Sequence, residues 1–223
     1  MYDVTATGEL LIDFTRNGLS EQNNRIYEAN PGGAPCNVLA MLGKLGYKTA
    51  FIGKVGDDEF GKLLKNTISE QKIDAAGLIL DPNAKTTLAF VDNDETGDRS
   101  FSFYRKPGAD MMLREDEVNY ELIDNCRIFH FGSLSMTDEP VRSATYAMID
   151  YAKKKNKIIS FDPNLRPPLW ESEDLAAKQI WYGIEQCDIL KIADNEIEWL
   201  TGTDDYDKGI EIIRQRTHAK LIN

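Results

Sequence analysis

Several residues that could bind a small molecule lie beside a pair of glycines. Residues 31–37 read Pro-Gly-Gly-Ala-Pro-Cys-Asn and open a predicted helix. Gly32 and Gly33 permit backbone angles and close approaches that a β-carbon forbids, so a ligand can lie directly against the main chain. Asn37 follows one turn into the helix, where its amide can donate to and accept from a hydroxyl group. The turn predicts a site for a small polar ligand, with an ordinary helix entry around a buried Asn as the alternative.

Further polar side chains follow two predicted strands. Asp13 ends the strand expected over residues 4–13. A second group follows the strand expected over residues 157–162, in a loop that three prolines stiffen, and consists of Asp162, Asn164 and Arg166. Ligands of open parallel sheets gather beyond the carboxyl ends of the strands. These side chains are therefore candidates for the mouth of a site, although an acid such as Asp13 can also be a solvated strand end.

Asn195 and Glu198 stand three residues apart at the start of another predicted helix, so they share one helical face. A carboxylate there could hold magnesium through water, or orient a phosphate together with the amide. A capping box with the same Asn-x-x-Glu spacing is the competing interpretation. The spacing alone leaves both interpretations open.

The elements that must hold these residues follow the pattern of an α/β protein. From residue 127 onward, predicted strands and helices alternate regularly, which indicates parallel strands with helices on the faces. The strands are expected over 127–132, 157–162 and 189–193, and the helices over 140–155, 173–187, 195–200 and 206–216. Upstream, a helix ending near Gly46 precedes a strand over 49–53. We therefore expect one domain over residues 1–223 with a Rossmann-like, mostly parallel central sheet and helices on both faces.

A hairpin is expected from strands over 87–92 and 99–105, joined by the turn-forming residues 93–98. Phe101 and Phe103 alternate with serines in its second arm, and Arg105 lies at the exit. A hairpin this short cannot hold a core, so its aromatic face must cover the main sheet, a partner chain or a ligand. With the polar stretch 14–30, residues 86–106 are predicted to form a discontinuous β lid, and a homodimer through this lid is one of the options.

Composition narrows the classes of function. The 223 residues are 42% hydrophobic and 28% charged, with a formal net charge of −11, which disfavours binding to nucleic acids or anionic membranes. Three widely spaced cysteines predict neither a disulfide framework nor a zinc site. No signal-peptide pattern and no apolar run long enough to span a bilayer are found, so a cytoplasmic protein is expected.

The end of the chain carries an expectation of its own. Residues 219–222 read as the start of another parallel strand, with no turn or closing helix after it. The alternating pattern stops in mid-unit. We therefore expect the C-terminal part of the fold, with some site residues, to be missing from this chain.

Six stretches, taken together and in order, resemble the ribokinase-like (PfkB) carbohydrate kinases, and most closely bacterial fructokinases. They are residues 8–14, 31–38, 53–61, 99–105, 161–166 and 195–198. Each stretch is modest alone, but their joint order from the first strand to the last helices is highly specific.

The resemblance implies ATP-dependent phosphorylation of a sugar hydroxyl, most closely fructose to fructose 6-phosphate, by a ribokinase-like α/β domain with a small β-sheet lid. By motif position, Asp13, Gly33 and Asn37 bind sugar hydroxyls. Arg105 and Arg166 flank the sugar and the transferred phosphate as candidate catalytic residues. The full set of substrate-binding candidates is Asp13, Gly32, Gly33, Asn37, Phe101, Phe103, Arg105, Asp162, Asn164 and Arg166.

The same resemblance implies a role for the second helix start, where residues 195–198 match the family's Asn-x-x-Glu motif. Asn195 is then a residue that binds the cofactor ATP, Glu198 serves Mg²⁺, and the complete enzyme has a site for a monovalent cation such as K⁺. The family's C-terminal Gly-Ala-Gly-Asp motif, which supplies the catalytic aspartate, has no counterpart in the sequence. Because phosphoryl transfer depends on positioning and electrostatic stabilisation, we expect little activity from this chain alone.

Other functions stay open at this point. A kinase for ribose or 2-keto-3-deoxygluconate would carry the same motifs, because they define the reaction better than the pattern of hydroxyls. A non-catalytic sugar-binding protein would explain the absent aspartate. A nicotinamide-dependent oxidoreductase is disfavoured, because no G-x-G-x-x-G follows the first strand.

Overall fold

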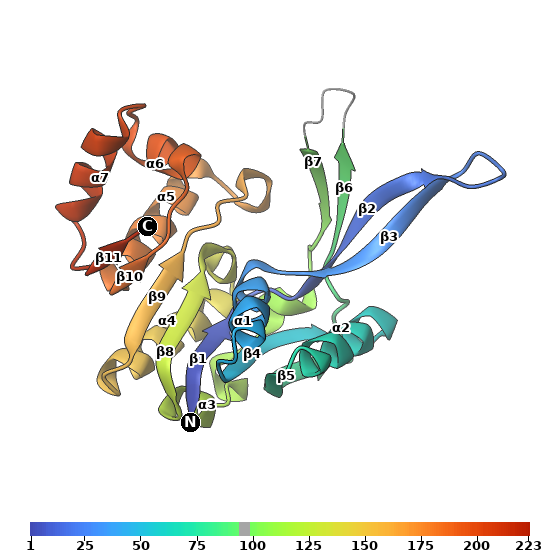
Figure 1. Ribbon diagram of the computed structural model, residues 1–223, viewed down its shortest axis with the longest axis horizontal. Helices are drawn as coiled ribbons and strands as arrows, with labels where there is room; N and C mark the ends of the chain where they lie inside the picture. Colours follow the sequence, from blue (N-terminus) through green and yellow to red (C-terminus); the bar gives the residue numbers. More distant parts are fainter. Residues whose placement is uncertain (94–98) are drawn as a thin grey trace.

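Two β-sheets organise the chain in the computed structural model, which describes residues 1–93 and 99–223 (Figure 1). The larger sheet has seven parallel strands in the order β11-β10-β9-β8-β1-β4-β5. Its strands are β1 (Tyr2–Thr7), β4 (Thr49–Gly56), β5 (Ile73–Asp81), β8 (Cys126–Gly132), β9 (Ile158–Asp162), β10 (Ile189–Leu190) and β11 (Leu221–Ile222). The expected central parallel sheet is confirmed.

Helices cover both faces of this sheet. The face that buries Leu39 and Leu64 is covered by α1 (Ala34–Lys44) and α2 (Glu59–Glu70). The opposite face packs against α3 (Glu121–Asp124), α4 (Val141–Lys154) and α5 (Glu173–Gln186), with α6 (Asp194–Thr201) and α7 (Tyr206–Arg214) contributing to the same core. Short 3₁₀ turns complete the connections: η1 (Ala109–Met112), η2 (Glu115–Glu117), η3 (Ser133–Met136) and η4 (Pro167–Leu169).

The order of the strands reverses at the centre of the sheet. From β1 the chain adds β4 and β5 on one side through α1 and α2. It later adds β8 on the other side, followed by β9 through α4, β10 through α5 and β11 through α6 and α7. Helices from the two directions therefore lie on opposite faces, and a crevice opens between β1 and β8 at their carboxyl ends. In open α/β sheets this switch point is where ligands bind.

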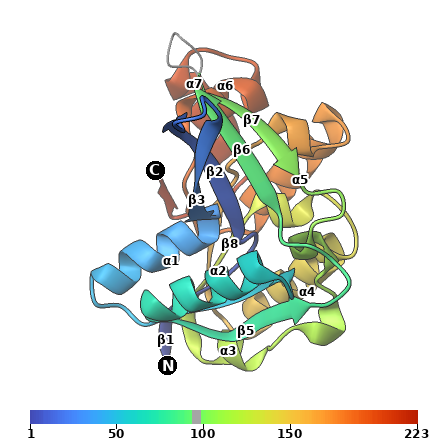
Figure 2. The same cartoon turned by 90° about the vertical axis from the view of Figure 1, so that its right-hand side faces the viewer.

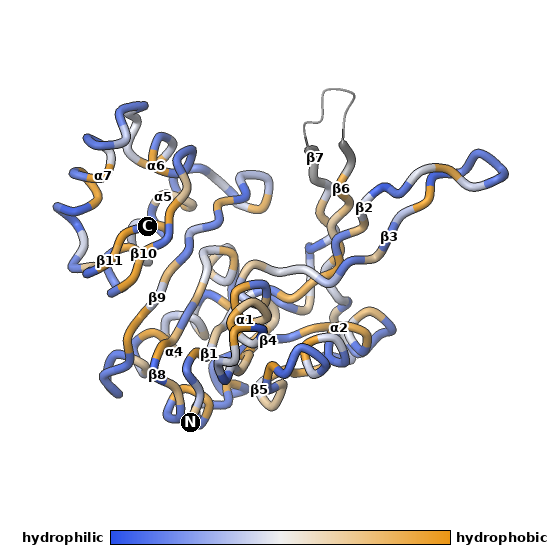
Figure 3. Tube along the Cα trace, viewed as in Figure 1, coloured by the Kyte–Doolittle hydropathy of each residue, from blue (hydrophilic) through white to orange (hydrophobic). Residues whose placement is uncertain are grey.

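The smaller sheet projects from the carboxyl end of the larger one (Figures 1 and 2). Its order is β3-β2-β6-β7, with two antiparallel hairpins joined by a parallel β2–β6 pair. The strands are β2 (Leu11–Leu19), β3 (Arg25–Gly32), β6 (Leu88–Asn93) and β7 (Arg99–Tyr104). The tip of the β2–β3 hairpin is hydrophilic, whereas the strands of the larger sheet are largely hydrophobic (Figure 3).

Aromatic side chains hold the smaller sheet together and fasten it to the larger domain. Phe14 stacks on Phe90 with ring centroids 4.9 Å apart, and Phe14 also meets Phe60 of α2 edge to face at 5.5 Å. Tyr104 packs edge-on against Phe90 at 5.5 Å, although its side chain is 66% exposed. These rings lie on the face of the smaller sheet opposite to Phe103, because Phe90 pairs with Ser102 and side chains alternate along β7.

Some expected elements differ in the structure. The strand expected over residues 4–13 is two strands in different sheets, because residues 8–10 turn the chain from β1 into β2. Hydropathy did not reveal the break, since Leu10 is buried in the passage itself. Strand β5 was not predicted, and β10 is two residues long. Of the expected hairpin turn, residues 94–98 lie outside the described part. No helix within residues 1–93 or 99–223 is long and apolar enough to cross a bilayer.

Candidate functional site

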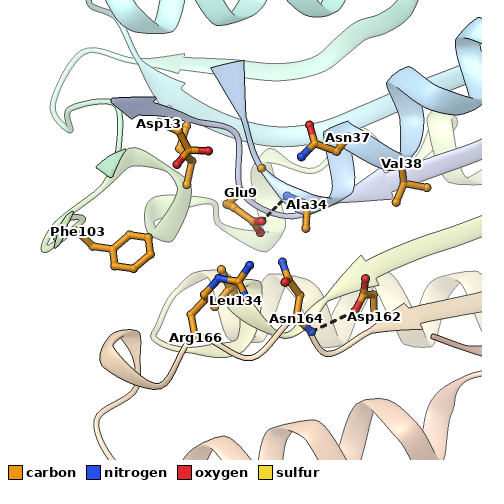
Figure 4. Close-up of a pocket in the computed structure, with 12 residues that line it drawn as sticks. Glu9, Asp13, Ala34, Asn37, Val38, Phe103, Leu134, Asp162, Asn164 and Arg166 are labelled. Atoms are coloured by element: carbon orange, nitrogen blue, oxygen red, sulfur yellow. Dashed lines mark hydrogen bonds between the residues drawn. The ribbon is translucent and has the colours of Figure 1, made fainter. Parts of the chain in front are cut away.

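A cavity of about 330 Å³ occupies the switch point of the larger sheet. It is lined by Glu9, Leu11, Asp13, Gly33, Ala34, Asn37, Val38, Phe103, Leu134, Asp162, Asn164 and Arg166. Figure 4 shows Glu9, Asp13 and Asn37 on one wall, facing a second wall of Asp162, Asn164 and Arg166. The cavity therefore brings together seven of the residues that the sequence singled out: Asp13, Gly33, Asn37, Phe103, Asp162, Asn164 and Arg166.

The glycine turn builds the first wall. Gly33 caps α1 with φ 121°, and a β-carbon there would lie 2.3 Å from the backbone oxygen of Glu9. Only glycine tolerates both the conformation and the contact. The backbone N–H of Asn37 then bonds to the Gly33 carbonyl at 3.0 Å, which places Asn37 one turn into the helix. The predicted close approach at this turn is made by the backbone of Glu9, which lies against Gly33. Asn37 lines the cavity.

Gly32 acts through its neighbour. A β-carbon on Gly32 would lie 2.2 Å from Oδ2 of Asp13, so the missing side chain makes room for that carboxylate. Gly32 itself lines a neighbouring pocket between α1 and α2, not this cavity. Burial raises the pKa of Asp13, while the positive charge of Arg166 across the cavity lowers it. Asp13 is thus a half-buried hydrogen-bonding group that faces a cation.

The second wall is a braced loop after β9. Burial raises the pKa of Asp162, and its Oδ1 accepts from Lys191 Nζ at 3.3 Å and from the backbone N–H of Asn164 at 3.2 Å. The hydroxyl of Ser133 donates to the Pro163 carbonyl at 2.5 Å, which ties the loop to η3. Asn164 adopts φ 45°, a left-handed conformation. These bonds hold the loop in the fixed position that its prolines predicted.

Arg105 differs from its expected place. It is buried, and its Nε pairs with Asp110 Oδ2 at 2.7 Å. Its other nitrogens donate to Thr137 Oγ1 at 3.0 Å and to the Leu134 carbonyl at 2.8 Å. The guanidinium group is therefore engaged by protein partners and is not part of the lining of this cavity, although Arg105 lines a neighbouring hollow with Phe103. Its contact with sugar and phosphate stays a prediction. Arg105 fastens the exit of β7 to η1 and to Leu134 of the cavity wall.

The two phenylalanines of β7 have different outcomes. Phe103 lines the cavity at one end, where Figure 4 shows its ring facing the space between the two walls. Phe101 belongs to β7, but its side chain lies outside the described part of the structure. Of these two residues, the described part of the structure places Phe103 at the cavity, and the prediction for Phe101 stays untested.

The structure at the start of α6 contradicts the interpretation of Asn195 and Glu198 as a capping box. Ala193 precedes the helix, and the residue three positions later is Glu196, whose Oε2 accepts the Ala193 N–H at 2.8 Å. The capping box therefore uses Glu196, and not Asn195 with Glu198. Both of the latter are exposed, and neither side chain bonds to another residue in the described ranges. Their amide and carboxylate oxygens suit magnesium, which takes few protein ligands and keeps several waters.

Sequence reasoning missed two acids that support the site. Glu9 is buried in the cavity wall. Glu196 does not line the cavity, but its Oε1 accepts a hydrogen bond from the backbone N–H of Leu165 at 2.6 Å. Glu196 thereby joins the loop of Arg166 to the start of α6. The signal for Glu9 was its position directly after the central strand β1, where carboxyl-end residues meet ligands. Glu196 could have been recognised as the capping residue only if the sequence had shown that α6 begins at Asp194.

Other reactive side chains stay outside the site. Burial lowers the pKa of His130 to about 4, and its Nδ1 hydrogen-bonds with Ser160 Oγ at 3.0 Å within the sheet. The cysteines Cys36, Cys126 and Cys187 are buried and form no disulfide. No cluster of three or more acidic, histidine or cysteine side chains that could hold a metal occurs in the part of the chain that the structure describes.

A doubly wound sheet with a polar cavity at its switch point and a small sheet beside it defines a class of α/β proteins that bind small polar molecules. Residues 1–222 match the profile of the pfkB family carbohydrate kinases. The chain belongs to this family, as the motif resemblance predicted.

Individual relatives agree with the family. A protein named probable fructokinase-6, chloroplastic, of Arabidopsis thaliana is 45% identical over 221 residues, which are 98% of this chain and 57% of that protein. A crystal structure of fructokinase from Xylella fastidiosa superimposes with a TM-score of 0.91 at 34% identity, covering 100% of this chain and 69% of that one. The chain spans from 57% to 68% of the length of curated relatives of this kind.

A second solved structure carries ligands. It is a double mutant of fructokinase from Vibrio cholerae O395, described as bound to fructose, ADP and a potassium ion. It superimposes with a TM-score of 0.88 at 32% identity, covering 100% of this chain and 69% of that chain. The fold around the cavity is therefore shared with a protein that holds a sugar and a nucleotide.

Proposed function

We propose that this protein phosphorylates a sugar hydroxyl with ATP, and that the sugar is fructose. The observation that carries the proposal is the cavity at the switch point, where carboxylate, amide and guanidinium groups converge from three separate segments. Such groups recognise molecules rich in hydroxyls, since each can take part in several directed hydrogen bonds. Relatives named fructokinase, one of them bound to fructose and ADP, support the choice of substrate.

Asp13 and Asn37 bind neighbouring sugar hydroxyls from one wall in this proposal. Arg166 faces them and neutralises the phosphate as it is transferred, while Asp162 and Asn164 complete the opposite wall. Phe103 covers the end of the cavity beside the smaller sheet. These roles follow from the chemistry of the side chains, because carboxylates accept hydrogen bonds from hydroxyl groups and a guanidinium group pairs with phosphate.

ATP and magnesium belong to the start of α6 in this proposal. Asn195 meets the nucleotide phosphates and Glu198 holds Mg²⁺ through water, since both side chains are exposed on one helical face. Magnesium supplies charge neutralisation between phosphate oxygens when it is bound. The ADP and potassium ion of the Vibrio cholerae structure support a nucleotide and a monovalent cation as ligands here.

The smaller sheet is the lid of the site in this proposal. It consists of β2, β3, β6 and β7 and contributes Phe103 to the cavity. Its outer surface exposes apolar side chains, including Leu19 at 50% and Tyr104 at 66%, which supports a homodimer formed through the lid. Light scattering behind size-exclusion chromatography should then report twice the monomer mass. A cytoplasmic location is supported by the free, buried cysteines.

Calorimetric titration with D-fructose, D-ribose and 2-keto-3-deoxygluconate tests the substrate. Fructose should bind most tightly, and tighter binding of either other sugar would redirect the proposal to that sugar. A coupled assay of ADP release with magnesium and ATP tests the transfer. Because the sequence has no Gly-Ala-Gly-Asp motif, these 223 residues should bind the sugar with little turnover. Absence of binding for all three sugars would contradict the proposal.

A further inference from the structure

A buried acid lies in the passage between the two sheets, where residues 8–10 connect β1 to β2. The Glu9 side chain is only 3% exposed, yet it lines the cavity on the same wall as Asp13 and Asn37 (Figure 4). Glutamates are almost never fully buried unless they are paired. The position of Glu9 therefore calls for a partner.

One partner is the glycine turn. Oε1 of Glu9 accepts a hydrogen bond from the backbone N–H of Ala34, the first residue of α1, at 2.8 Å. The backbone oxygen of Glu9 also lies against Gly33, where a β-carbon would come within 2.3 Å of it. Glu9 thus contacts the glycine turn with both its backbone oxygen and its carboxyl group. Its carboxyl group has a fixed position relative to Asn37.

The other carboxyl oxygen has no such bond. Among the residues with described side chains, none other than Glu9 itself donates a hydrogen bond to Oε2. Figure 4 shows the carboxyl group directed into the cavity, toward the wall that carries Asn164 and Arg166. A carboxyl oxygen can take part in more than one hydrogen bond, so a ligand hydroxyl in the cavity can bond to this one in addition to any contact with the backbone N–H of Glu9.

We propose that Glu9 is a sugar-binding residue: one carboxyl oxygen holds the turn at Ala34, and the other bonds to a hydroxyl group of the sugar. This inference rests on the proposed function and deepens it. With Asp13 and Asn37 it places three hydrogen-bonding side chains on one wall of the cavity. Three such groups can distinguish sugars by the arrangement of adjacent hydroxyls, because each wrong hydroxyl leaves a buried group unpaired.

The protonation of Glu9 gives this contact a signature. Burial raises its pKa to about 7, with a smaller raising effect of Asp110, against the lowering effects of hydrogen bonds from the backbone of Glu9 and Ala34 and of the charge of Arg105. The titratable and charged groups around it are Cys36 of α1, Arg105 and Asp110 beneath the cavity, and Asp13, Asp162 and Arg166 in the cavity. Below pH 7 the group is neutral, so its carbonyl oxygen accepts from Ala34 and its hydroxyl donates to the sugar.

The sign of the pH dependence follows from desolvation. A bound sugar excludes more water from the carboxyl group, which favours the neutral form. Sugar affinity is therefore highest below pH 7 and falls as the group ionises. For one group with a pKa of about 7 that must hold its proton, the affinity falls about tenfold between about pH 6 and about pH 8.

Calorimetric titration of D-fructose across this pH range, with wild type and two variants, tests the inference. Glu9→Gln keeps a carbonyl oxygen for Ala34 and an N–H for the sugar, so it should retain the affinity seen at low pH and lose the decline. Glu9→Met keeps the length but neither hydrogen bond, so it should bind at least about tenfold more weakly at low pH. Both variants retain Asp13 and Asp162, so a changed profile belongs to Glu9. Circular dichroism melting verifies that each variant folds.

Two results would overturn the inference. One is a Glu9→Gln variant that keeps the wild-type decline with pH. The other is a folded Glu9→Met variant that binds fructose as tightly as wild type. If Glu9→Met does not fold, the comparison of wild type with Glu9→Gln decides alone. Wild type that binds none of fructose, ribose and 2-keto-3-deoxygluconate would overturn the proposed function and this inference together, which is a distinct outcome.

Discussion

The two ends of the proposed reaction are built differently. Around the cavity proposed to bind the sugar, Glu9, Asp13 and Asp162 are held by burial, by close glycine contacts or by hydrogen bonds to neighbouring segments. At the start of α6, Asn195 and Glu198 are exposed and bond to no other side chain in the described ranges. One region has its geometry before any ligand arrives. The other offers side chains whose positions are set by what they bind.

This difference matches what each ligand can supply. A sugar is neutral and brings only weak, directional hydrogen bonds, so the protein must fix the acceptors and donors in advance to avoid paying for their ordering. ATP with magnesium brings strong charges and bound water that can order flexible side chains. We therefore expect changes in the cavity to affect folding, sugar affinity or both, and changes at Asn195 and Glu198 to leave both alone.

The largest expected effect is that of Gly33→Ala. Its φ of 121° and the backbone oxygen 2.3 Å from a new β-carbon should lower the free energy of unfolding by about 3 kcal/mol or more, measured by urea denaturation. Gly18→Ala is the matched control, because Gly18 has φ 83° with nothing within 4 Å of a new β-carbon. It should cost about 1 kcal/mol. Equal decreases in the free energy of unfolding of both variants would show that the backbone at Gly33 can shift to accommodate a β-carbon at little cost.

Asp13→Asn should mainly affect sugar affinity. The amide replaces an acceptor by a donor beside Gly32, and loss of a hydrogen bond to a charged group should weaken fructose binding about 10- to 100-fold. Calorimetry measures this loss. Asp57→Asn, at an acid 47% exposed before α2, is the control and should bind fructose like wild type. An Asp13→Asn variant with wild-type affinity would remove Asp13 from the site.

Glu196→Ala sharpens the comparison within one helix. It removes acceptors from the backbone N–H groups of Ala193 and Leu165, which lie 2.8 and 2.6 Å from the carboxylate. The free energy of unfolding should fall by about 2 kcal/mol. Glu198→Ala, two residues away and exposed, should change it by less than about 0.5 kcal/mol. A similar loss in both variants would contradict the division between a fixed and an open region.

Glu198→Gln should have the smallest effect on the fold and should weaken the binding of ATP selectively. Glu198→Gln removes the charge proposed to hold Mg²⁺, so ATP affinity at limiting magnesium should fall roughly tenfold while fructose affinity stays unchanged. Titrations of ATP at two magnesium concentrations, followed by fructose, measure both. Weaker fructose binding in this variant would mean that the two regions are not separate.

Much of the architecture could be predicted, because it depends on local patterns. Alternating strands and helices indicated the parallel sheet, and the polar residues after β9 indicated the second wall of the cavity. The glycine pair at 32–33 indicated a close approach at this turn, which Glu9 and Asp13 of the chain itself make in the structure. These features are written in neighbouring residues, so periodicity and turn chemistry were sufficient.

The remainder depends on contacts between distant segments. Asp110 pairs with Arg105 only once β7 and η1 are packed together, a contact between segments that the motif does not reveal. Glu9 becomes part of the cavity because β1 passes directly into a second sheet, a turn that the apolar run 10–12 conceals. The capping residue of α6 changes with a shift of one position in the helix start. Sequence patterns do not fix boundaries that closely.

The chain crosses between its two sheets at four places: after β1, after β3, before β6 and after β7. Two of these crossings, at Glu9 and at Gly33, are themselves parts of the cavity wall. In a tilt of the smaller sheet about these crossings, the displacement of each residue grows with its distance from them. The tip of the β2–β3 hairpin would therefore move farthest, and the groups at Glu9 and Gly33 would move least. The dimensions of the cavity are thereby less sensitive to such a tilt than the position of the hairpin tip.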